Sequence, residues 1–255
     1  MLNWWKALNN IKVLLVNADD VGLYTQLACT ITRAANKYDD PRALLDDVQG
    51  RPWSMSKVNE ILHLPHGKVS RITDFVFLVM GTSRRFLAQL TTHHVGITTI
   101  SGSLQYSDHS KRHLSDMFVV PYNMLATNDK SDIDNYLEEQ YHCFNQYLEM
   151  IQQGYTNDDA GYTMPQSLRN ALLIKVNLEE LKFIGNQRLC KRNTDETRYV
   201  FAKMIQEVCK QVDIDDDLFM PSCHHEKCKE GQYCCGKPFK GTIDEYLEQE
   251  FPCLK

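Results

Sequence analysis

Two short apolar runs in the first third of the chain predict buried secondary structure. Residues 11–18 (IKVLLVNA) are apolar and rich in β-branched side chains, which favours a buried strand. Residues 73–80 (TDFVFLVM) are apolar and aromatic. So short a run has no periodicity that separates a strand from the start of a buried helix, and both interpretations stay open there.

Longer stretches with one apolar and one polar face predict helices. The pattern over residues 131–154 is the strongest and stops at Gly154, a residue type that commonly ends helices. Pro165 begins a further predicted helix, which extends to about residue 185. The other predicted helices cover residues 24–36, 55–62, 83–94 and 195–212. Residues 96–110 are rich in Gly, Ser and Thr and are predicted to form a loop.

The composition changes near the C-terminus. After residues 213–217, Cys, His, Lys and Gly crowd into residues 223–240. We therefore expect one large domain over residues 1–217 and a Cys/His-rich tail over residues 218–255.

The overall composition argues against several classes of protein. A formal net charge of −5 and a pI near 6.0 argue against a partner such as duplex nucleic acid. No segment approaches the roughly 18–20 apolar residues of a membrane span. Residues 1–6 lack a basic segment followed by an apolar run, so no secretory signal is predicted. The nine cysteines are then expected to be thiols or metal ligands in a reducing, cytoplasmic compartment.

Polar residues on the predicted helix over 83–94 form the first candidate site. Arg84, Gln89, His93 and His94 lie on this helix or at its exit, just before the Gly/Ser/Thr-rich loop. Backbone N–H groups and hydroxyls in such a loop bind phosphate oxygens, which suits a nucleotide. From spacing alone, a solvated helix end followed by a flexible loop is the simpler interpretation.

A group of cations forms the second candidate site. Arginine is a natural partner for phosphate because its planar fork donates two parallel hydrogen bonds. Acidic neighbours would pair with the same cations on an ordinary surface, so both interpretations stay open. The cations are Arg188, Lys191, Arg192 and Arg198, and the acidic neighbours are Glu179, Glu180, Asp195 and Glu196.

The tail carries the third candidate site. Thiolates and imidazoles at short spacings suit a tetrahedral zinc site. We therefore predict that zinc is bound by Cys223, Cys228, Cys234 and Cys235, which lie close to His224 and His225 in the sequence. A thiol-rich ordered tail without metal and a set of disulfides are the alternatives.

Several segments, in chain order, resemble the flavin-dependent thymidylate synthases up to about residue 240. Residues 66–77 (HGKVSRITDFVF) are similar to that family's H-x-S-P-x-E-H-x-x-F-T-F, and residues 83–94 (SRRFLAQLTTHH) to its S-R-A-F-x-x-Q-L-x-R-H-R. Residues 103–106 (SLQY) are similar to S-x-R-Y, and residues 147–165 to Y-x-x-L-I-x-x-G-x-x-x-E-D-A-R-x-x-L-P. Residues 177–188 and 196–198 are similar to N-x-R-x-L-x-x-F-x-x-x-R followed by E-I-R.

The chain departs from this pattern at cationic positions. The Arg-His-Arg signature appears as Thr92-His93-His94, and Gly161 and Glu179 stand where the family has Arg. Each charge-assisted hydrogen bond lost would cost on the order of 1.5–3 kcal/mol. The candidate replacements are Arg71, Arg85, Lys175 and Lys182.

The resemblance implies both a fold and an activity. The fold is α/β (α+β), with a central mixed or antiparallel sheet flanked by helices and a small Cys-rich C-terminal appendage, in a homotetramer whose sites are shared between subunits. The activity is C5 methylation of deoxyuridine monophosphate (dUMP) to thymidylate, with FAD as cofactor, methylenetetrahydrofolate and NADPH as co-substrates, and no covalent protein nucleophile.

The resemblance also assigns site residues by position. The nucleotide would be held by Gln89, Ser103, Arg188, Arg84 and Tyr106, of which Gln89, Ser103 and Arg188 would converge on one monophosphate. Flavin or folate would lie near His66, Thr92, His93, His94, Ser101 and Asn177. The alternatives are a same-fold enzyme that modifies C5 of a different pyrimidine nucleotide, and a non-catalytic pyrimidine-nucleotide-binding homologue that has lost flavin.

Overall fold

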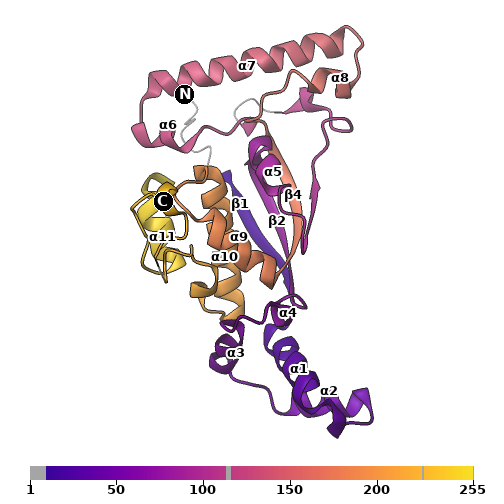
Figure 1. The fold of residues 1–255 in the computed structure, drawn as a ribbon. Helices are drawn as coiled ribbons and strands as arrows, with labels where there is room; N and C mark the ends of the chain where they lie inside the picture. The colour runs from indigo at the N-terminus through magenta and orange to yellow at the C-terminus, as the bar shows by residue number, and fades with distance from the viewer. Residues whose placement is uncertain (1–9, 113–115, 226, 255) are drawn as a thin grey trace.

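A four-stranded antiparallel sheet lies at the centre of the molecule in the computed structural model, which describes residues 10–112, 116–225 and 227–254 (Figure 1). The strand order is β1-β2-β4-β3. The bounds are Lys12–Ala18 for β1, Asp74–Ser83 for β2, Ile97–Ser101 for β3 and Arg169–Asn177 for β4. The strand predicted over residues 11–18 is confirmed, and the open alternative over residues 73–80 is resolved in favour of a strand.

The helix predicted from Pro165 to about residue 185 is wrong in its first half, which is strand β4. Leu172, Ile174 and Val176 alternate with more exposed residues, and β4 pairs with β2 on one side and β3 on the other. The predicted loop over 96–110 likewise contains β3. The two strands could not be predicted from their own residues, because backbone hydrogen bonds to neighbouring strands stabilise such segments.

The helices predicted over residues 24–36, 55–62, 83–94, 131–154 and 195–212 are confirmed within a few residues, apart from the third, which ends at Leu90. Side-chain caps begin several of them: Ser83 accepts a hydrogen bond from the backbone N–H of Phe86, and Asn177 accepts one from Glu180. The α-helices are α1 (Val21–Ala34), α2 (Pro41–Gly50), α3 (Met55–Leu62), α4 (Gly67–Ser70), α5 (Arg84–Leu90), α6 (Tyr122–Thr127), α7 (Lys130–Gln152), α8 (Asn157–Gly161), α9 (Leu178–Arg188), α10 (Asp195–Val212) and α11 (Ile243–Glu250).

The two faces of the sheet differ in burial. Phe75, Phe77 and Val79 of β2 are fully buried and belong to the same core as Phe201 of α10, the helix that packs on β1 and β2. On the other face one apolar residue from each strand stands exposed in a single row across the sheet. The row is Leu14, Leu78, Leu173 and Ile100, with exposed fractions of 54%, 37%, 41% and 64%.

The C-terminal segment packs against α10 (Figure 1). Tyr246 of α11 is completely buried, and its hydroxyl accepts a hydrogen bond from Nε of Arg198 at 2.9 Å. Phe239 and Phe251 are buried in the same hydrophobic core as the sheet. The tail is thus anchored through its aromatic side chains.

Within the described residues, no helix combines the length and the apolar character needed to cross a membrane. The prediction about a secretory signal concerns residues 1–6, which lie outside the described residues.

Candidate functional site

The C-terminal ends of α5 and α9 bring together polar side chains that are distant in sequence. Arg188, in the last turn of α9, donates hydrogen bonds to Oε1 of Gln89 at 3.4 Å and to Oγ1 of Thr92 at 2.8 Å. Its Nε–H donates to Nε2 of His93 at 2.8 Å, and its Nη1 also donates to Oδ1 of Asn193 at 3.2 Å. We name as the Arg188 cluster the residues Gln89, Thr92, His93, Glu180, Arg188 and Asn193.

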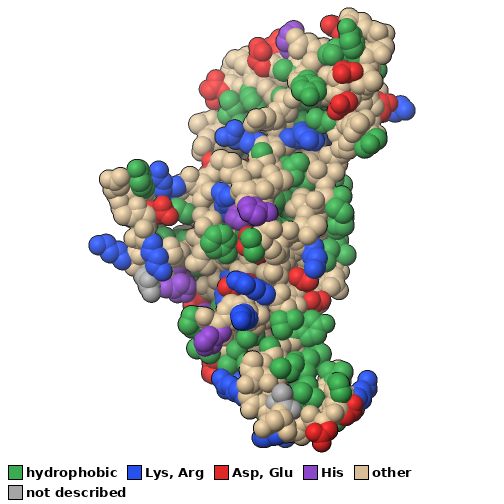
Figure 2. Space-filling model, turned by 45° about the vertical axis from the view of Figure 1, so that its right-hand side comes forward, with side chains coloured by type: hydrophobic (Ala, Val, Ile, Leu, Met, Phe, Trp, Pro, Cys, Tyr) green, Lys and Arg blue, Asp and Glu red, His purple; other side chains and the backbone are tan. Residues whose placement is uncertain are grey.

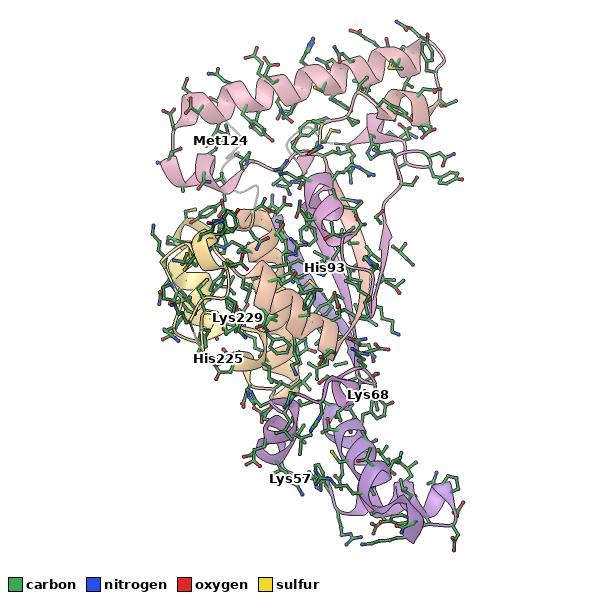
Figure 3. The ribbon with its side chains drawn as sticks, in the orientation of Figure 1. Lys57, Lys68, His93, Met124, His225 and Lys229 are labelled. Carbon is green, nitrogen blue, oxygen red and sulfur yellow. The ribbon has the colours of Figure 1, made fainter. Side chains whose placement is uncertain are left out.

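His93, labelled in Figure 3, connects Arg188 to a buried carboxylate. Because its Nε2 accepts from Arg188, its Nδ1 carries the proton and donates to Oε1 of Glu180 at 2.9 Å. Burial lowers the pKa of His93; the hydrogen bond to Glu180 opposes this, and the charges of Arg188 and His94 reinforce it. A neutral imidazole therefore fixes the direction of the guanidinium. The burial of Glu180 could not be predicted from the sequence, because Glu180 stands next to Glu179 in a charged run.

The charge of Arg188 is not neutralised by a carboxylate. Its four hydrogen-bond partners are a hydroxyl, an imidazole and two amides, and no acidic side chain of the described residues forms an ion pair with it. Burial lowers the pKa of Arg188. A half-buried cation with neutral partners is suited to bind an anion.

The other cations of the predicted site have partners elsewhere. Lys191 forms an ion pair with Glu250 at 2.6 Å, and Arg192 donates to the carbonyl of Tyr233 at 2.6 Å. Arg198 is buried and pairs with Asp195 and Glu250. Of the candidate replacements, Lys175 pairs with Asp74, Lys182 donates to the carbonyl of Leu62, and Arg85 donates to Gln166. These contacts lie outside the Arg188 cluster.

Asn177 and the turn at Gly96 contact each other next to the Arg188 cluster and add further polar groups there. The backbone N–H of Asn177 donates to the carbonyl of Gly96 at 2.8 Å, and a Cβ at Gly96, where φ is +72°, would lie 2.2 Å from Nδ2 of Asn177. His94 is exposed at the same turn, and its Nδ1 contacts the carbonyl of Thr92 at 3.1 Å. His66 occupies the N-cap position of α4 without a side-chain capping hydrogen bond among the described residues, and the first residue of that helix, Gly67, lies against the Glu179 carboxylate of α9.

A second group of the predicted residues surrounds Ser103. Its Oγ accepts hydrogen bonds from the backbone N–H groups of Gln105 and Tyr106 at 3.1 and 3.3 Å, and Arg84 donates to the carbonyl of Gly102 at 3.4 Å. An open cavity of about 470 Å³, which we name the Ser103 pocket, is lined by Arg84, Ser101, Gly102, Ser103, Leu104, Gln105, Asp158, Gly161 and Tyr162. Tyr106 is 83% exposed.

The two groups lie at opposite ends of β3. Gly96, beside Asn177, precedes the strand, and Ser101, in the Ser103 pocket, ends it. Five residues of strand separate these ends by about 16 Å. Within one chain, Gln89 and Arg188 are in contact and Ser103 belongs to the other group, so a single chain does not bring the three residues together. Their convergence on one monophosphate stays a prediction for a site shared between subunits.

The tail cysteines share one cavity. Cys223, Cys228, Cys234 and Cys235, joined by Cys190 from the segment after α9, line a cavity of about 470 Å³. All are free thiols, and the side chains of Cys228 and Cys234 are hydrogen-bonded. No three of these sulfur atoms lie within 4.8 Å of one another in the part of the chain that the structure describes. The zinc site at these four cysteines stays a prediction.

Comparisons with known proteins fit this fold. The family model "Thymidylate synthase complementing protein" matches residues 23–212, and the chain belongs to this family. Among curated relatives, the flavin-dependent thymidylate synthases of Pyrococcus abyssi and Pyrococcus furiosus are 28% and 29% identical, over 63% and 60% of this chain. The matched regions span 68% and 62% of those two proteins.

Solved structures show the same fold. Thymidylate synthase X (ThyX) from Helicobacter pylori, solved with FAD and dUMP, superimposes with a TM-score of 0.62 at 14% identity, covering 82% of this chain and 99% of that one. The UMP/dUMP methylase PolB from Streptomyces cacaoi, bound with 5-Br dUMP, superimposes with a TM-score of 0.60 at 16% identity. The superposition covers 79% of this chain and 90% of the methylase chain. The α+β fold with an antiparallel sheet and flanking helices is thereby confirmed.

Proposed function

We propose that this protein methylates C5 of deoxyuridine monophosphate to give thymidylate, using FAD, methylenetetrahydrofolate and NADPH. The observation that carries the proposal is the Arg188 guanidinium, which is held by neutral partners and has no carboxylate to pair with among the described residues. The family of the chain and the dUMP bound to the H. pylori structure support a pyrimidine monophosphate as the anion.

The Arg188 cluster would bind the nucleotide. Arg188 donates to the phosphate oxygens, since its charge is uncompensated and one of its five N–H donors is left over. Glu180 and neutral His93 hold the guanidinium in place before the nucleotide arrives, which reduces the entropy lost on binding. Gln89 offers an amide to the ligand from the same helix end.

The donors beside the cluster fit a flavin, whose ring edge pairs with neutral hydrogen-bonding groups. Nδ2 of Asn177 has no hydrogen-bond partner among the described residues, and Thr92 and His94 expose a hydroxyl and an imidazole at the same turn. His66 would lie near flavin or folate from α4. Bound flavin supplies hydride chemistry and folate the one-carbon unit, while these side chains bind and orient.

We infer further that a second copy of the chain completes the site. Ser101, Ser103, Arg84 and Tyr106 would then reach the nucleotide from the Ser103 pocket of a neighbouring subunit in a homotetramer. The row of exposed apolar residues across the sheet supports association, because apolar area of this kind gains about 25 cal/mol per Å² when buried. Figure 2 shows hydrophobic side chains along the right-hand margin of the molecule. The division at residue 217 is also a proposal, in which the tail is an appendage of the catalytic domain.

A second candidate function is C5 modification of another pyrimidine nucleotide. Gly161 is buried against Leu104, so the Ser103 pocket holds an apolar contact where the family pattern places Arg. The UMP/dUMP methylase that shares this fold supports a change of substrate.

One experiment separates these proposals. Purified protein is examined by absorption spectroscopy for flavin and then incubated with folate, NADPH and dUMP or UMP, with products identified by mass spectrometry. Thymidylate from dUMP supports the first proposal, and product from UMP alone supports the second. A colourless protein that takes up no added flavin and yields no product, yet is stabilised by nucleotide, would leave a non-catalytic binding protein.

A further inference from the structure

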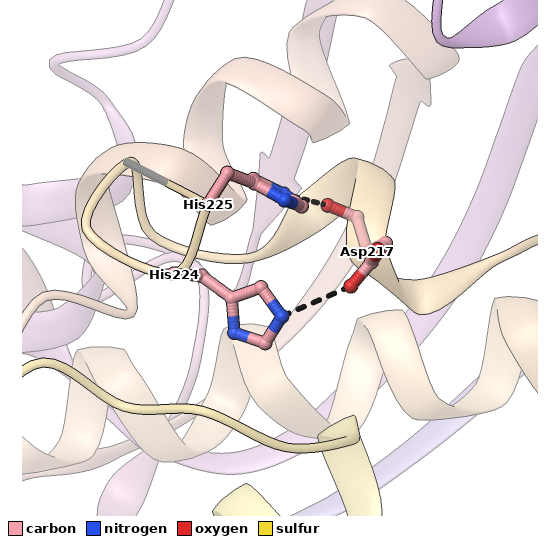
Figure 4. A group of neighbouring side chains, drawn as sticks. All are labelled: Asp217, His224 and His225. Carbon is pink, nitrogen blue, oxygen red and sulfur yellow. Dashed lines mark hydrogen bonds and ion pairs between the residues drawn. The ribbon is translucent and has the colours of Figure 1, made fainter. Parts of the chain in front are cut away.

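A group of three potential metal-ligand atoms lies close together among the described residues, outside the candidate active site. Asp217, His224 and His225 each present one ligand atom, and these three atoms lie within 4.8 Å of one another (Figure 4). We propose that these three residues bind a single divalent transition metal, with zinc as the physiological class of ion. This proposal does not depend on the reaction proposed above.

The side chains already converge on one point. Nε2 of His224 lies 3.0 Å from Oδ1 of Asp217, and Nε2 of His225 lies 2.9 Å from the Asp217 carbonyl. The two rings are nearly perpendicular, with centroids 4.9 Å apart, so that both edges face Asp217 (Figure 4). Two imidazoles and one carboxylate are a donor set that zinc prefers, and a fourth position faces solvent because Asp217 and His225 are exposed.

The movement required to bind an ion is small. Ligand atoms at about 2.0–2.2 Å from a tetrahedral zinc are about 3.4 Å apart, so a pair at the 4.8 Å limit must close by about 1.4 Å. Rotation of the exposed Asp217 and His225 side chains supplies this. His224 is more constrained, with a side chain 12% exposed, and its buried Nδ1 has no hydrogen-bond partner in the described part of the chain.

The ion would attach the tail to the site-bearing helix. Asp217 belongs to the short 3-10 helix η6 (Asp216–Phe219), whose Phe219 carbonyl lies so close to Gly185 of α9 that a Cβ there would approach it to 2.2 Å. The neighbouring Asp216 accepts from the backbone N–H of Ile243 at 2.6 Å, at the start of α11. A metal at Asp217 therefore joins residues 224–225, α9 and α11 at one structural element.

Metal binding to the untagged full chain tests the proposal. Chelator-stripped protein is dialysed against zinc, and bound metal is measured by elemental analysis. In the Cys228→Ser with Cys234→Ser background, which removes the predicted cysteine site, about one equivalent is expected, and below about 0.2 after addition of Asp217→Asn or of His224→Gln with His225→Gln. His63→Gln is the matched control, because His63 also faces a carboxylate, Asp215, at 3.5 Å but without a third ligand. Circular dichroism checks that each variant is folded.

Cobalt distinguishes this site from the tail cysteines. Co²⁺ bound to nitrogen and oxygen gives visible bands without the near-ultraviolet charge transfer of cobalt–thiolate bonds. In Cys228→Ser with Cys234→Ser we expect one bound cobalt without such charge transfer. Zinc retained by folded His224 and His225 variants of this background, or no metal bound by the folded cysteine variant itself, would each overturn the proposal.

Discussion

Nε of Arg188 donates a hydrogen bond to Nε2 of His93 at 2.8 Å, across 95 positions of sequence. The same imidazole donates from Nδ1 to Glu180, so a carboxylate, a neutral ring and a guanidinium form one chain of contacts. The ring separates the two charges, and Arg188 stays free to bind an anion.

Replacement of Arg188 tests the anion site. Arg188→Gln should weaken dUMP binding by about 10- to 150-fold, the loss of a charge-assisted hydrogen bond worth 1.5–3 kcal/mol. Titration calorimetry measures the affinity. Arg85→Gln is the control, because the exposed Arg85 side chain donates to Gln166 at 3.4 Å and to no other described residue. Equal dUMP affinities in the two variants would show that Arg188 does not bind the nucleotide.

Mixing two inactive variants tests whether subunits share a site. Arg188→Gln and Ser103→Ala each impair one of the two groups. If each site takes these groups from different copies, mixed oligomers should regain activity, up to about a quarter of the wild type for random assembly. No recovery after co-refolding, with mixed oligomers verified by mass spectrometry, would place both residues in the site of one chain.

A charge on the exposed sheet face tests the association surface. Ile100→Asp should shift the protein toward smaller species in sedimentation velocity, since a buried carboxylate without a partner is costly. Ile31→Asp is the matched control, because Ile31 of α1 is also more than half exposed. A wild-type protein that sediments as a monomer would contradict the proposal that subunits associate through this sheet face.

The pH dependence of stability tests the neutral state of His93. Burial lowers the pKa of His93, so the unfolded chain binds the proton more readily than the folded chain. This contribution to stability is complete above the unfolded pKa of about 6.5 and is lost as the pH falls from there toward the folded pKa. Thermal melts should show a shallower loss in His93→Gln. His109, whose pKa is also lowered by burial, leaves a residual loss in both proteins.

Glu250 tests how the tail is attached. Its carboxylate pairs with buried Arg198 and with Lys191, and Glu250→Ala leaves Asp195 as the remaining carboxylate partner of Arg198. Urea denaturation should show a loss of about 1.5–3 kcal/mol in the free energy of unfolding, the range for a lost hydrogen bond to a charged group. Glu139→Ala, on an exposed position of α7, should change it by less than about 0.5 kcal/mol. Similar losses for both would argue that the tail contributes little to stability.

Much of the secondary structure could be predicted from local patterns. The strand β1 and the helices α3, α7 and α10 follow from apolar runs and amphipathic periodicity, which are properties of contiguous sequence. The strand β4 could not be predicted in this way. Its run of alternating residues follows a proline that suggested a helix, and its state is decided by β2 and β3, which precede it by many residues.

The sequence by itself determined the family and the residues that could serve the site, because both depend on the order and spacing of side chains. Spacing alone presented Arg188, Lys191, Arg192 and Arg198 as equivalent cations, and the resemblance to the family singled out Arg188. The tertiary structure supplied the physical reason, since the tail occupies Lys191, Arg192 and Arg198, while His93 and Gln89 hold Arg188 without neutralising it. Ser103 was assigned to the same ligand, yet β3 places it at the other end of a strand. Charge pairing and strand geometry act between distant segments, and a linear sequence does not state which segments meet.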